Sequence, residues 1–430
     1  MIVSPVFAGR HYAVLGLARS GRATVAALLA SGARVTAWDG DEDKRAGAPA
    51  DAGLAIADPL EIDLAGFDGV VVSPGVPLNR HPIAARARAA GVPVIGDIEL
   101  FAQARAHLPP HRVVGITGTN GKSTTTALIH HMLDTAGVPA LMGGNIGLPI
   151  LDRDPLPAGG VYVLELSSYQ IDLTVGLDCD VAVLTNITPD HLDRYDGFAV
   201  YAASKARLFA MQSPGHVAVI ATEDERTRAI AASHRDAGAT LVEVASTAIA
   251  DQSRWPALQG PHNAQNVACA VSACTALGLS ADAIERGLAT FPGLPHRMER
   301  VAEKAGVLYV NDSKATNATA AAPALAAYPA IHWILGGLPK TDDLDDCAPF
   351  FGHVRAAYTI GQAGPLFAAI LRRSGTPVTE SGTLEQAVRD AAAAARPGET
   401  VMLSPACASF DQFSDYEARG QAFRVAVGTL

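Results

Sequence analysis

The stretch that most constrains the fold is residues 113–123, Val-Val-Gly-Ile-Thr-Gly-Thr-Asn-Gly-Lys-Ser. A β-branched apolar run ends in a glycine-bearing turn, and a helical pattern of apolar residues follows over 127–133. A tight turn between a strand and a helix points backbone N–H groups at one spot, and the helix dipole reinforces them. Lys122 adds a mobile positive charge, and Ser123 adds a hydroxyl that can ligate Mg²⁺. This stretch therefore predicts a polyphosphate cradle for ATP or GTP.

The loop departs from the usual phosphate-binding pattern at one position. That pattern has a glycine five residues before Gly121, where this chain has Ile116. The match is to the shorter form Gly118-x-x-Gly121-Lys122-Ser123. The alternative interpretation is a plain glycine turn that begins an ordinary helix, with Lys122 in solvent.

Size and composition narrow the class of protein. A chain of 430 residues predicts about three domains. A formal net charge of −10 argues against a nucleic-acid-binding surface, which carries a basic excess. The five cysteines lack paired metal-type spacing and indicate buried thiols in a reducing compartment. Without a leader pattern or a long apolar run, we expect a soluble cytoplasmic protein that does not enter the membrane.

Strand and helix signals alternate through the whole chain, which predicts an α/β protein with mainly parallel sheets. We expect a Rossmann-like domain over 1–96, a central P-loop mononucleotide-binding domain over 97–295 and a second Rossmann-like domain over 296–430. Strands are predicted at 11–15, 34–38, 69–72, 113–117, 161–166, 181–185, 307–310, 332–335 and 400–403, and a helix over 198–210. Polar clusters follow these strands, and the carboxyl ends of parallel strands converge.

The first segment has a phosphate-type turn over 16–21, with Asp39 about twenty residues on, where a ribose or base is often bound. A loop that begins at Ser73 follows the strand over 69–72. The glycine fingerprint is incomplete, so the alternative is a plain Rossmann-like domain whose glycines serve turns only.

Glu165 ends an otherwise apolar strand. A buried carboxylate must be paired or must hold a metal, because an isolated buried charge is costly. Mg²⁺ prefers oxygen ligands, so Glu165 with Ser123 and a phosphate fits that ion. The alternative is a glutamate at the strand end that faces water.

Lys205 lies on the apolar stripe of the predicted helix over 198–210, beside Tyr201, Leu208 and Phe209. The pattern alone favours snorkelling, in which the stem packs and the ammonium reaches water. The other interpretation is a partly desolvated lysine with a lowered pKa. Its neutral amine can take up CO₂ and become a carbamate, which can ligate Mg²⁺.

Two further residues carry open interpretations. His191 follows a strand end in an acidic turn, although a lone histidine is more often a hydrogen-bonded structural residue than a ligand. Arg297 follows a proline turn at a predicted hinge between domains, where an arginine can reach a γ-phosphate on domain closure. Without other support it is a surface arginine.

Taken in order, these motifs resemble those of the Mur ligases, the ATP-dependent amide-forming enzymes of peptidoglycan precursor synthesis. Residues 118–123 look like the family's shortened phosphate loop, and residues 165–170, 186–191 and 260–266 are similar to further family blocks. Residues 311–317 and 403–413 resemble the members that add D-glutamate. Residues 336–340 depart from the family pattern, which has a polar pair before Lys340.

The resemblance implies a three-domain α/β fold and a two-step ligase reaction. ATP phosphorylates the carboxylate of UDP-N-acetylmuramoyl-L-alanine, and the amine of D-glutamate then captures the acyl phosphate. It implies two Mg²⁺ ions and a CO₂-derived carbamate on Lys205, and it favours the carbamate over snorkelling. The partners are then small molecules, with no nucleic acid or membrane, and we expect a monomer that serves cell-wall synthesis, cell shape and cell division.

The resemblance also implies site residues, in five groups. The catalytic residues are Lys122, His191, Lys205 and Arg297. The ATP site comprises Gly118, Thr119, Asn120, Gly121, Lys122, Ser123, Thr124, Asn263, Asn266, Arg297, Asp312 and Lys314. The metal ligands are Ser123, Glu165, His191 and carbamylated Lys205. The UDP-substrate site comprises Gly16, Leu17, Ala18, Arg19, Asp39, Ser73, Pro74, Gly75 and Asn145. The D-glutamate site comprises Thr316, Lys340, Ser409, Phe410 and Tyr416.

Three other functions remain open on the sequence. A sibling Mur ligase or a folylpolyglutamate synthase is disfavoured by the Ser-Lys-Ala-Thr block over 313–316. A nucleotide-dependent switch would not need His191, Lys205 or a second anion-binding domain. A nicotinamide oxidoreductase is disfavoured by the incomplete glycine fingerprint. The ligase interpretation requires Lys122, Glu165 and Lys205 to lie together in the folded molecule.

Overall fold

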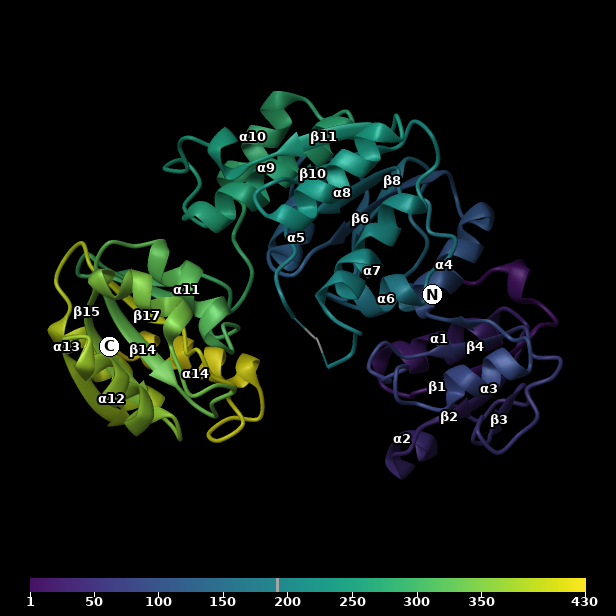
Figure 1. Ribbon diagram of the computed structural model, residues 1–430, viewed down its shortest axis with the longest axis horizontal. Helices are drawn as coiled ribbons and strands as arrows, with labels where there is room; N and C mark the ends of the chain where they lie inside the picture. Colours follow the sequence, from purple (N-terminus) through teal and green to yellow (C-terminus); the bar gives the residue numbers. More distant parts are fainter. Residues whose placement is uncertain (191–192) are drawn as a thin grey trace. The chain divides into compact units, whose positions relative to one another are not determined.

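A computed structural model gives the structure of the chain and describes residues 1–190 and 193–430. The chain forms two compact units (Figure 1). Unit 1 comprises residues 1–248 and 265–288, and unit 2 comprises residues 249–264 and 289–430. The predicted three-domain α/β architecture appears as three sheets, two in unit 1 and one in unit 2.

The first sheet of unit 1 has five parallel strands in the order β3-β2-β1-β4-β5. Its strands are β1 (His11–Leu15), β2 (Arg34–Trp38), β3 (Leu54–Ile56), β4 (Gly69–Val72) and β5 (Val94–Ile95). Its helices are α1 (Arg19–Ala30), α2 (Glu42–Ala46) and α3 (Ile83–Ala89). The strands predicted at 11–15, 34–38 and 69–72 are confirmed with the same bounds.

The second sheet of unit 1 has six parallel strands in the order β11-β10-β9-β6-β8-β7. They are β6 (His111–Thr117), β7 (Ala140–Gly144), β8 (Gly160–Glu165), β9 (Val181–Leu184), β10 (Val217–Ala221) and β11 (Thr240–Val244). The helices of this part of the chain are α4 (Asp97–Ala104), α5 (Lys122–Thr135), α6 (Ser168–Asp172), α7 (Phe198–Ala210), α8 (Glu225–Asp236), α9 (Pro261–Ala276) and α10 (Ala281–Thr290). Helix α7 has the predicted bounds.

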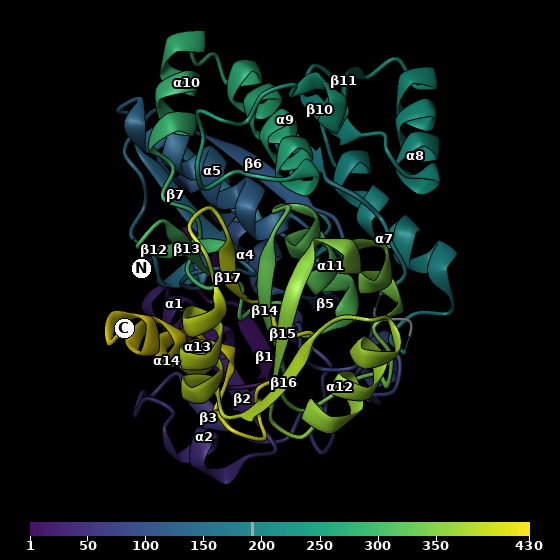
Figure 2. The same ribbon diagram turned by 90° about the vertical axis from the view of Figure 1, so that its left-hand side faces the viewer.

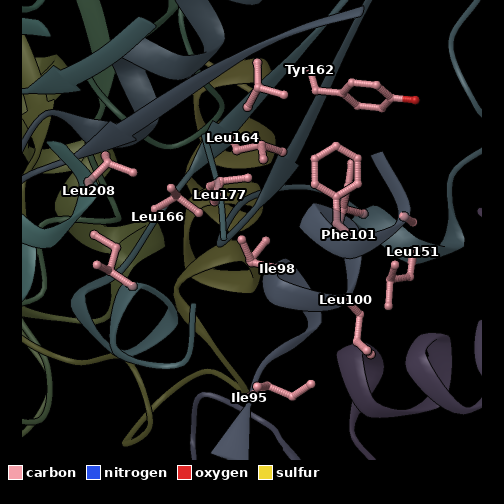
Figure 3. Packing of buried hydrophobic residues seen from close by; sticks show 14 of the residues in the cluster. Ile95, Ile98, Leu100, Phe101, Leu151, Tyr162, Leu164, Leu166, Leu177 and Leu208 are labelled. Carbon is pink, nitrogen blue, oxygen red and sulfur yellow. The ribbon is translucent and has the colours of Figure 1, made fainter. Parts of the chain in front are cut away.

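One apolar core joins the two sheets of unit 1. Its members come from both sheets and from α4, the helix that connects them. Figure 3 shows Ile98, Leu100 and Phe101 of α4 among leucines of the second sheet and its loops, and the ring of Phe101 lies 4.9 Å from that of Tyr162. Because close-packed side chains resist displacement, this shared core holds the ends of both sheets in one body.

Unit 2 contains a mixed six-stranded sheet in the order β12-β13-β17-β14-β15-β16. Its strands are β12 (Glu299–Lys304), β13 (Val307–Asn311), β14 (Ile331–Gly336), β15 (Val354–Ile360), β16 (Val378–Gly382) and β17 (Thr400–Leu403). Strand β12 was not predicted, and it pairs antiparallel with β13. Ala305 and Gly306 alone connect these strands, with φ of 50° and 75°, and two-residue turns of this kind join antiparallel strands.

The helices of unit 2 cover both faces of its sheet. They are α11 (Ala318–Ala326), α12 (Gly364–Arg373), α13 (Leu384–Ala394) and α14 (Tyr416–Gly428). Apolar residues of α11 and α12 share one core, and those of α13 and α14 share another. Figure 2 shows α12 and α13 on opposite sides of β14–β16. No helix among those described has the length and apolarity that a membrane span needs.

Glu99 of α4 is a buried carboxylate with a structural role. Its Oε2 accepts hydrogen bonds from the backbone N–H of Val175 at 2.7 Å and of Gly176 at 2.8 Å, and its Oε1 accepts one from Gln103 at 3.1 Å. The carboxylate therefore satisfies two amides of a central loop and ties the connecting helix to the second sheet.

We predict that Glu99→Ala lowers the free energy of unfolding by about 2 kcal/mol, because it leaves two amide donors without their acceptor. Urea unfolding followed by circular dichroism measures this change. Glu61→Ala, which removes an exposed glutamate of the same unit, is the matched control. Equal stability of the two variants would contradict the structural role of Glu99.

Candidate active site

The turn between β6 and α5 depends on two glycines. Gly118 has φ of 149°, and a Cβ there would lie 2.0 Å from Thr185 Oγ1. Gly121 has φ of 82°, and a Cβ there would lie 2.2 Å from Asn266 Oδ1. Both the backbone conformation and the close neighbours exclude side chains at these positions. The glycine spacing read from the sequence is therefore a steric requirement of this turn.

The loop that follows β9 supports the phosphate-type turn. The N–H of Asn120 donates to Asn186 Oδ1 at 2.8 Å, and the N–H of Thr119 donates to Asn186 O at 2.8 Å. Thr185 Oγ1 donates to Asn120 O at 2.6 Å. Behind it, the buried Gln265 donates from Nε2 to Thr185 O at 2.7 Å. Thr185 and Gln265 were not predicted as site residues, although Gln265 stands inside the 260–266 block.

Two lysines meet at one carbonyl oxygen in this turn. Lys122 Nζ donates to Gly118 O at 2.9 Å and to Thr119 O at 2.7 Å. Lys205 Nζ, from α7, donates to the same Gly118 O at 2.7 Å. Lys205 is only 1% exposed, so the snorkelling interpretation is wrong. Because the apolar stripe of α7 faces the core, the stem of Lys205 leads inward and its ammonium ends at the turn.

The electrostatic surroundings of Lys205 favour its neutral form. Burial, followed by repulsion from Lys122, holds its pKa well below the usual value, against weaker attraction from Asp190, Asp172 and Glu165. Its Nζ also lies 4.6 Å from the centre of the Tyr201 ring. A neutral lysine amine is a nucleophile, which is the condition that carbamate formation requires.

Glu165 is 2% exposed at the end of β8, so the water-facing alternative is wrong. Its Oε1 accepts a hydrogen bond from Asn145 Nδ2 at 2.8 Å. Its Oε2 is buried and has no hydrogen-bond partner among the residues that the structure describes. A buried carboxylate oxygen in this state is costly, and a cation would compensate it. With the buried hydroxyl of Ser123, the donor set fits Mg²⁺.

The predicted meeting of Lys122, Glu165 and Lys205 is confirmed. Strands β6 and β8 are adjacent, with Ile116 paired to Glu165, and both lysines reach the turn that β6 enters. Within 1–190 and 193–430, no three His, Cys, Asp or Glu side chains gather as a metal cluster. His191 lies outside the described residues.

The first sheet also brings its predicted residues together. Ser73 Oγ donates to Gly16 O at 3.1 Å, which joins the two loops at the carboxyl ends of β1 and β4. Asp39 accepts from the N–H of Leu17 at 2.7 Å and of Asp41 at 3.0 Å. Burial by itself would raise the pKa of Asp39. The hydrogen bonds from these two amides and the charge of Lys44 outweigh it, so the pKa of Asp39 is lowered. Asp39 therefore fixes the glycine turn as an ionised acceptor.

Two other residues predicted for the UDP-substrate site lie beside the second sheet. Arg19 Nη2 donates to Gly147 O at 2.8 Å, and the N–H of Asn145 donates to Glu165 O at 2.8 Å. The chain segment over 145–147 thus connects the predicted substrate turn with the strand end that carries Glu165.

In unit 2, Asp312 follows β13 and is buried. Its Oδ2 accepts from Ser404 Oγ at 2.8 Å, and its Oδ1 accepts from the N–H of Met298 at 3.2 Å. Burial raises its pKa to about 7. Arg297 is half-buried in the neighbouring turn, and the amide nitrogen of buried Asn263 donates to Gln259 O at 3.0 Å.

The predicted amino-acid residues gather on loops of unit 2. Lys340 Nζ donates to Thr316 Oγ1 at 3.2 Å, Ser409 is buried and Phe410 is 69% exposed. Lys314 Nζ lies 3.8 Å from the centre of the Tyr416 ring. These contacts join loops that follow β13, β14 and β17.

Two structural features of these loops were not foreseen. The buried Arg419 donates to Ser313 O at 2.8 Å and to Cys407 O at 3.1 Å, so it holds the loops after β13 and β17 together. Residues 336–340 depart from the family pattern, and Gly337 lies among them. A Cβ on Gly337 would lie 2.3 Å from Ala408 O. Close backbone approach therefore accounts for the glycine at 337 in this chain.

Comparison with known proteins places this geometry in a family. The model of the Mur ligase middle domain matches residues 116–272, and that of the Mur ligase glutamate ligase domain matches residues 296–407. The chain belongs to the Mur ligase family. It is 66% identical to the UDP-N-acetylmuramoylalanine–D-glutamate ligase of Novosphingobium aromaticivorans, over 100% of this chain and 97% of that protein. It is 62% identical to the ligase of the same name from Zymomonas mobilis, over 100% of both chains.

Solved structures of other Mur ligases share the fold. The D-alanyl-D-alanyl-adding ligase of Acinetobacter baumannii has a TM-score of 0.61 at 16% identity, over 99% of this chain and 92% of that one. The UDP-N-acetylmuramate–alanine ligase of Thermotoga maritima has a TM-score of 0.59 at 15% identity, over 98% of this chain and 99% of that one. The whole α/β arrangement is thus a Mur ligase fold.

We predict that Gly121→Ala weakens binding of a fluorescent ATP analogue by about tenfold or more, because the added Cβ displaces Asn266 and deforms the turn; a tenfold loss corresponds to about 1.4 kcal/mol. Titration in the presence of Mg²⁺ measures the affinity. Gly137→Ala is the matched control, since Gly137 also has positive φ, of 74°, but nothing lies within 4 Å of its added Cβ. Both variants pay about 1 kcal/mol of backbone strain. Equal affinities would exclude the steric role of the Asn266 contact.

Proposed function

We propose that this chain joins D-glutamate to UDP-N-acetylmuramoyl-L-alanine with hydrolysis of ATP to ADP and phosphate, in peptidoglycan precursor synthesis. The single observation that carries the proposal is the cluster at the end of β6. There, two lysines share the carbonyl of Gly118 next to the strand that ends in the buried Glu165. The full-length identity to D-glutamate ligases selects this member of the family.

The first step transfers the γ-phosphoryl group of ATP to the carboxylate of the UDP-substrate and forms an acyl phosphate. Negative charge builds on the transferred group, so positioned donors and cations lower the barrier. The amide of Gly121, the first amides of α5 and the ammonium of Lys122 hold the β- and γ-phosphates, while the amides of Thr119 and Asn120 bind Asn186 and keep the turn in shape. Thr124 lies in the first turn of α5, where the helix dipole favours anions.

The second step is attack of the D-glutamate amine on the acyl carbon, with loss of phosphate. The amino acid binds to loops of unit 2, where Lys340 supplies the positive charge for its carboxylates. The other residues of this site are Thr316, Ser409, Phe410 and Tyr416. Arg297 binds the phosphates of ATP. The nucleoside side of ATP is bound by Asn263, Asn266, Asp312 and Lys314.

Ser123 and Glu165 would hold one Mg²⁺, and His191 with carbamylated Lys205 would hold the second. These ions supply positive charge to the phosphate and acyl oxygens. Carbamate formation joins Lys205 Nζ to the carbon of CO₂ and releases one proton. The low pKa of Lys205 supports this step, because only the neutral amine attacks CO₂.

The UDP-substrate binds at the first sheet. Gly16, Leu17, Ala18 and Arg19 form its diphosphate turn, Asp39 acts at the uracil end, and Ser73, Pro74 and Gly75 lie alongside. Asn145 contacts the muramoyl part. The protein works as a cytoplasmic monomer on small-molecule partners.

We predict that the purified protein releases phosphate from ATP only when Mg²⁺, UDP-N-acetylmuramoyl-L-alanine and D-glutamate are all present. A coupled phosphate assay measures the rate, and mass spectrometry identifies the product. L-Glutamate, L-alanine and diaminopimelate serve as controls. Turnover that does not depend on D-glutamate would contradict the proposed function.

We also predict that Lys205→Ala reduces turnover by at least about a thousandfold and leaves the fold intact, because it removes the amine that carries the proposed carbamate, on which the phosphoryl step depends. Addition of ¹³C-labelled bicarbonate should give a carbamate carbonyl signal by NMR in the wild-type protein and none in the variant. Arg207→Ala, which changes an exposed-face cation of the same helix, is the control. Normal rate and Mg²⁺ dependence of Lys205→Ala would exclude the carbamate.

A further inference from the structure

Arg194 connects two segments of unit 1 that lie far apart in the sequence. Its Nη2 donates to Val76 O at 2.9 Å and to Pro74 O at 3.4 Å, and its Nη1 donates to Gly75 O at 3.4 Å. One guanidinium therefore collects three successive carbonyl oxygens. They belong to the loop after β4, which begins with Ser73 and is joined through it to the turn at Gly16.

The connection is made from both sides. Asn79 Nδ2 donates to Asp193 O at 3.1 Å, and Arg80 Nη2 donates to the same oxygen at 3.3 Å. The loop over 74–80 thus accepts hydrogen bonds from Arg194 and donates hydrogen bonds to Asp193, the residue before Arg194. Such a reciprocal arrangement fixes both position and orientation of the two segments.

Arg194 itself packs against helix α6, which follows β8 of the second sheet. Its guanidinium carbon lies 4.3 Å from the centre of the Tyr169 ring, and that ring stacks with Tyr195 at 5.9 Å. Tyr195 in turn donates to Asp172 Oδ2 at 2.8 Å and contacts the ring of Tyr201 at 5.4 Å. These contacts hold the planar guanidinium in one orientation, as arginine–aromatic stacking does.

The aromatic chain continues to the phosphate turn. The hydroxyl of Tyr201 lies 3.1 Å from Thr119 Oγ1, and its ring faces Lys205. Tyr201 thus packs between the support of Arg194 and the phosphate-type turn, while Arg194 itself binds the loop over 74–76.

Apolar packing holds one side of this loop, since Val76 and Leu78 pack against the core of the first sheet, and hydrogen bonds hold the other side. A cavity of about 160 Å³ lies at the junction and is lined by Pro74, Val76, Asn79, Tyr169, Arg194 and Tyr195. Close packing is therefore incomplete on the side of the loop that faces this cavity. There the hydrogen bonds of Arg194, one of 2.9 Å and two longer ones of 3.4 Å, orient the peptide groups.

We propose that Arg194 is a positioning residue for the UDP-substrate: it orients the peptide groups over 74–76 so that this loop presents a preformed edge to the substrate. The proposal rests on the proposed function. Because a peptide N–H points away from its own C=O, carbonyls held by Arg194 direct the N–H of Gly75 to the opposite side of the loop. The positive charge also polarises these peptide groups and favours an anionic ligand there.

The test compares Arg194→Ala and Arg194→Lys with Arg228→Ala. Arg228 is the matched control, because its guanidinium also donates to backbone carbonyls, Thr222 O and Glu223 O, both at 3.2 Å, and these belong to the segment between β10 and α8. Binding of UDP-N-acetylmuramoyl-L-alanine is measured by calorimetry without ATP, and KM is measured for all three substrates.

We expect Arg194→Ala to weaken substrate binding and to raise its KM by about tenfold, the loss typical of hydrogen bonds to a charged group. KM for ATP and for D-glutamate should change by less than about twofold, because Arg194 touches neither proposed site. Arg194→Lys should recover less than half of the lost affinity on a logarithmic scale, since an ammonium cannot serve three carbonyls in one plane. Arg228→Ala should bind the UDP-substrate as the wild type does.

The outcomes separate this inference from the proposed function. A wild-type protein that binds no UDP-substrate and shows no D-glutamate-dependent turnover overturns the function. An active wild type with unchanged substrate binding in Arg194→Ala overturns the inference alone. Equal loss for all three substrates together with a lowered melting temperature also overturns it, because it indicates general destabilisation. Should Arg194→Ala not fold, Asn79→Ala, at an exposed position, must raise KM for the UDP-substrate selectively, or the inference is wrong.

Discussion

The carbonyl oxygen of Gly118 is the point on which the site depends. It accepts hydrogen bonds from Lys122 and from Lys205, and these two ammonium groups repel each other. Burial, followed by repulsion from Lys122, lowers the pKa of Lys205. The same backbone oxygen therefore holds two lysines in unequal surroundings, because Lys205 is buried and Lys122 is only partly buried, and burial disfavours the charged form of a lysine.

This arrangement requires a rigid support, and the shared core of unit 1 provides it. Helix α4 contributes to a core that includes residues of both sheets, so the loops at the carboxyl ends of β1, β4, β6 and β8 belong to one body. Arg19, Asn145 and Arg194 add polar connections between the same loops. Parallel sheets place their loops at one edge, and the core fixes how the two edges relate within this unit.

Much of the fold and part of the site could be predicted, and the failures have physical causes. The strands with continuous apolar runs, such as β1, β4 and β17, have the predicted bounds, because buried parallel strands show that pattern. Strand β12 escaped prediction because its half-exposed sequence lacks an apolar run. Snorkelling of Lys205, which the helical pattern alone favoured, is wrong because such a stripe shows which face of a helix is buried but not how deep that face lies. Thr185 and Gln265 act through side-chain hydrogen bonds to backbone carbonyls, which no spacing reveals.

The sequence by itself determined the class of fold, the family and the phosphate turn, since glycine spacing and apolar periodicity are local consequences of backbone sterics and burial. Only the tertiary structure decided that one carboxylate oxygen of Glu165 has no hydrogen-bond partner among the described residues. It also decided that Lys205 donates to Gly118 O, and that Arg194 binds a loop over a hundred residues away in the sequence. Those properties depend on how deeply a side chain is buried and on how close remote segments of the chain lie. The local sequence encodes neither the burial depth nor this distance, because both follow from how complete sheets pack against one core.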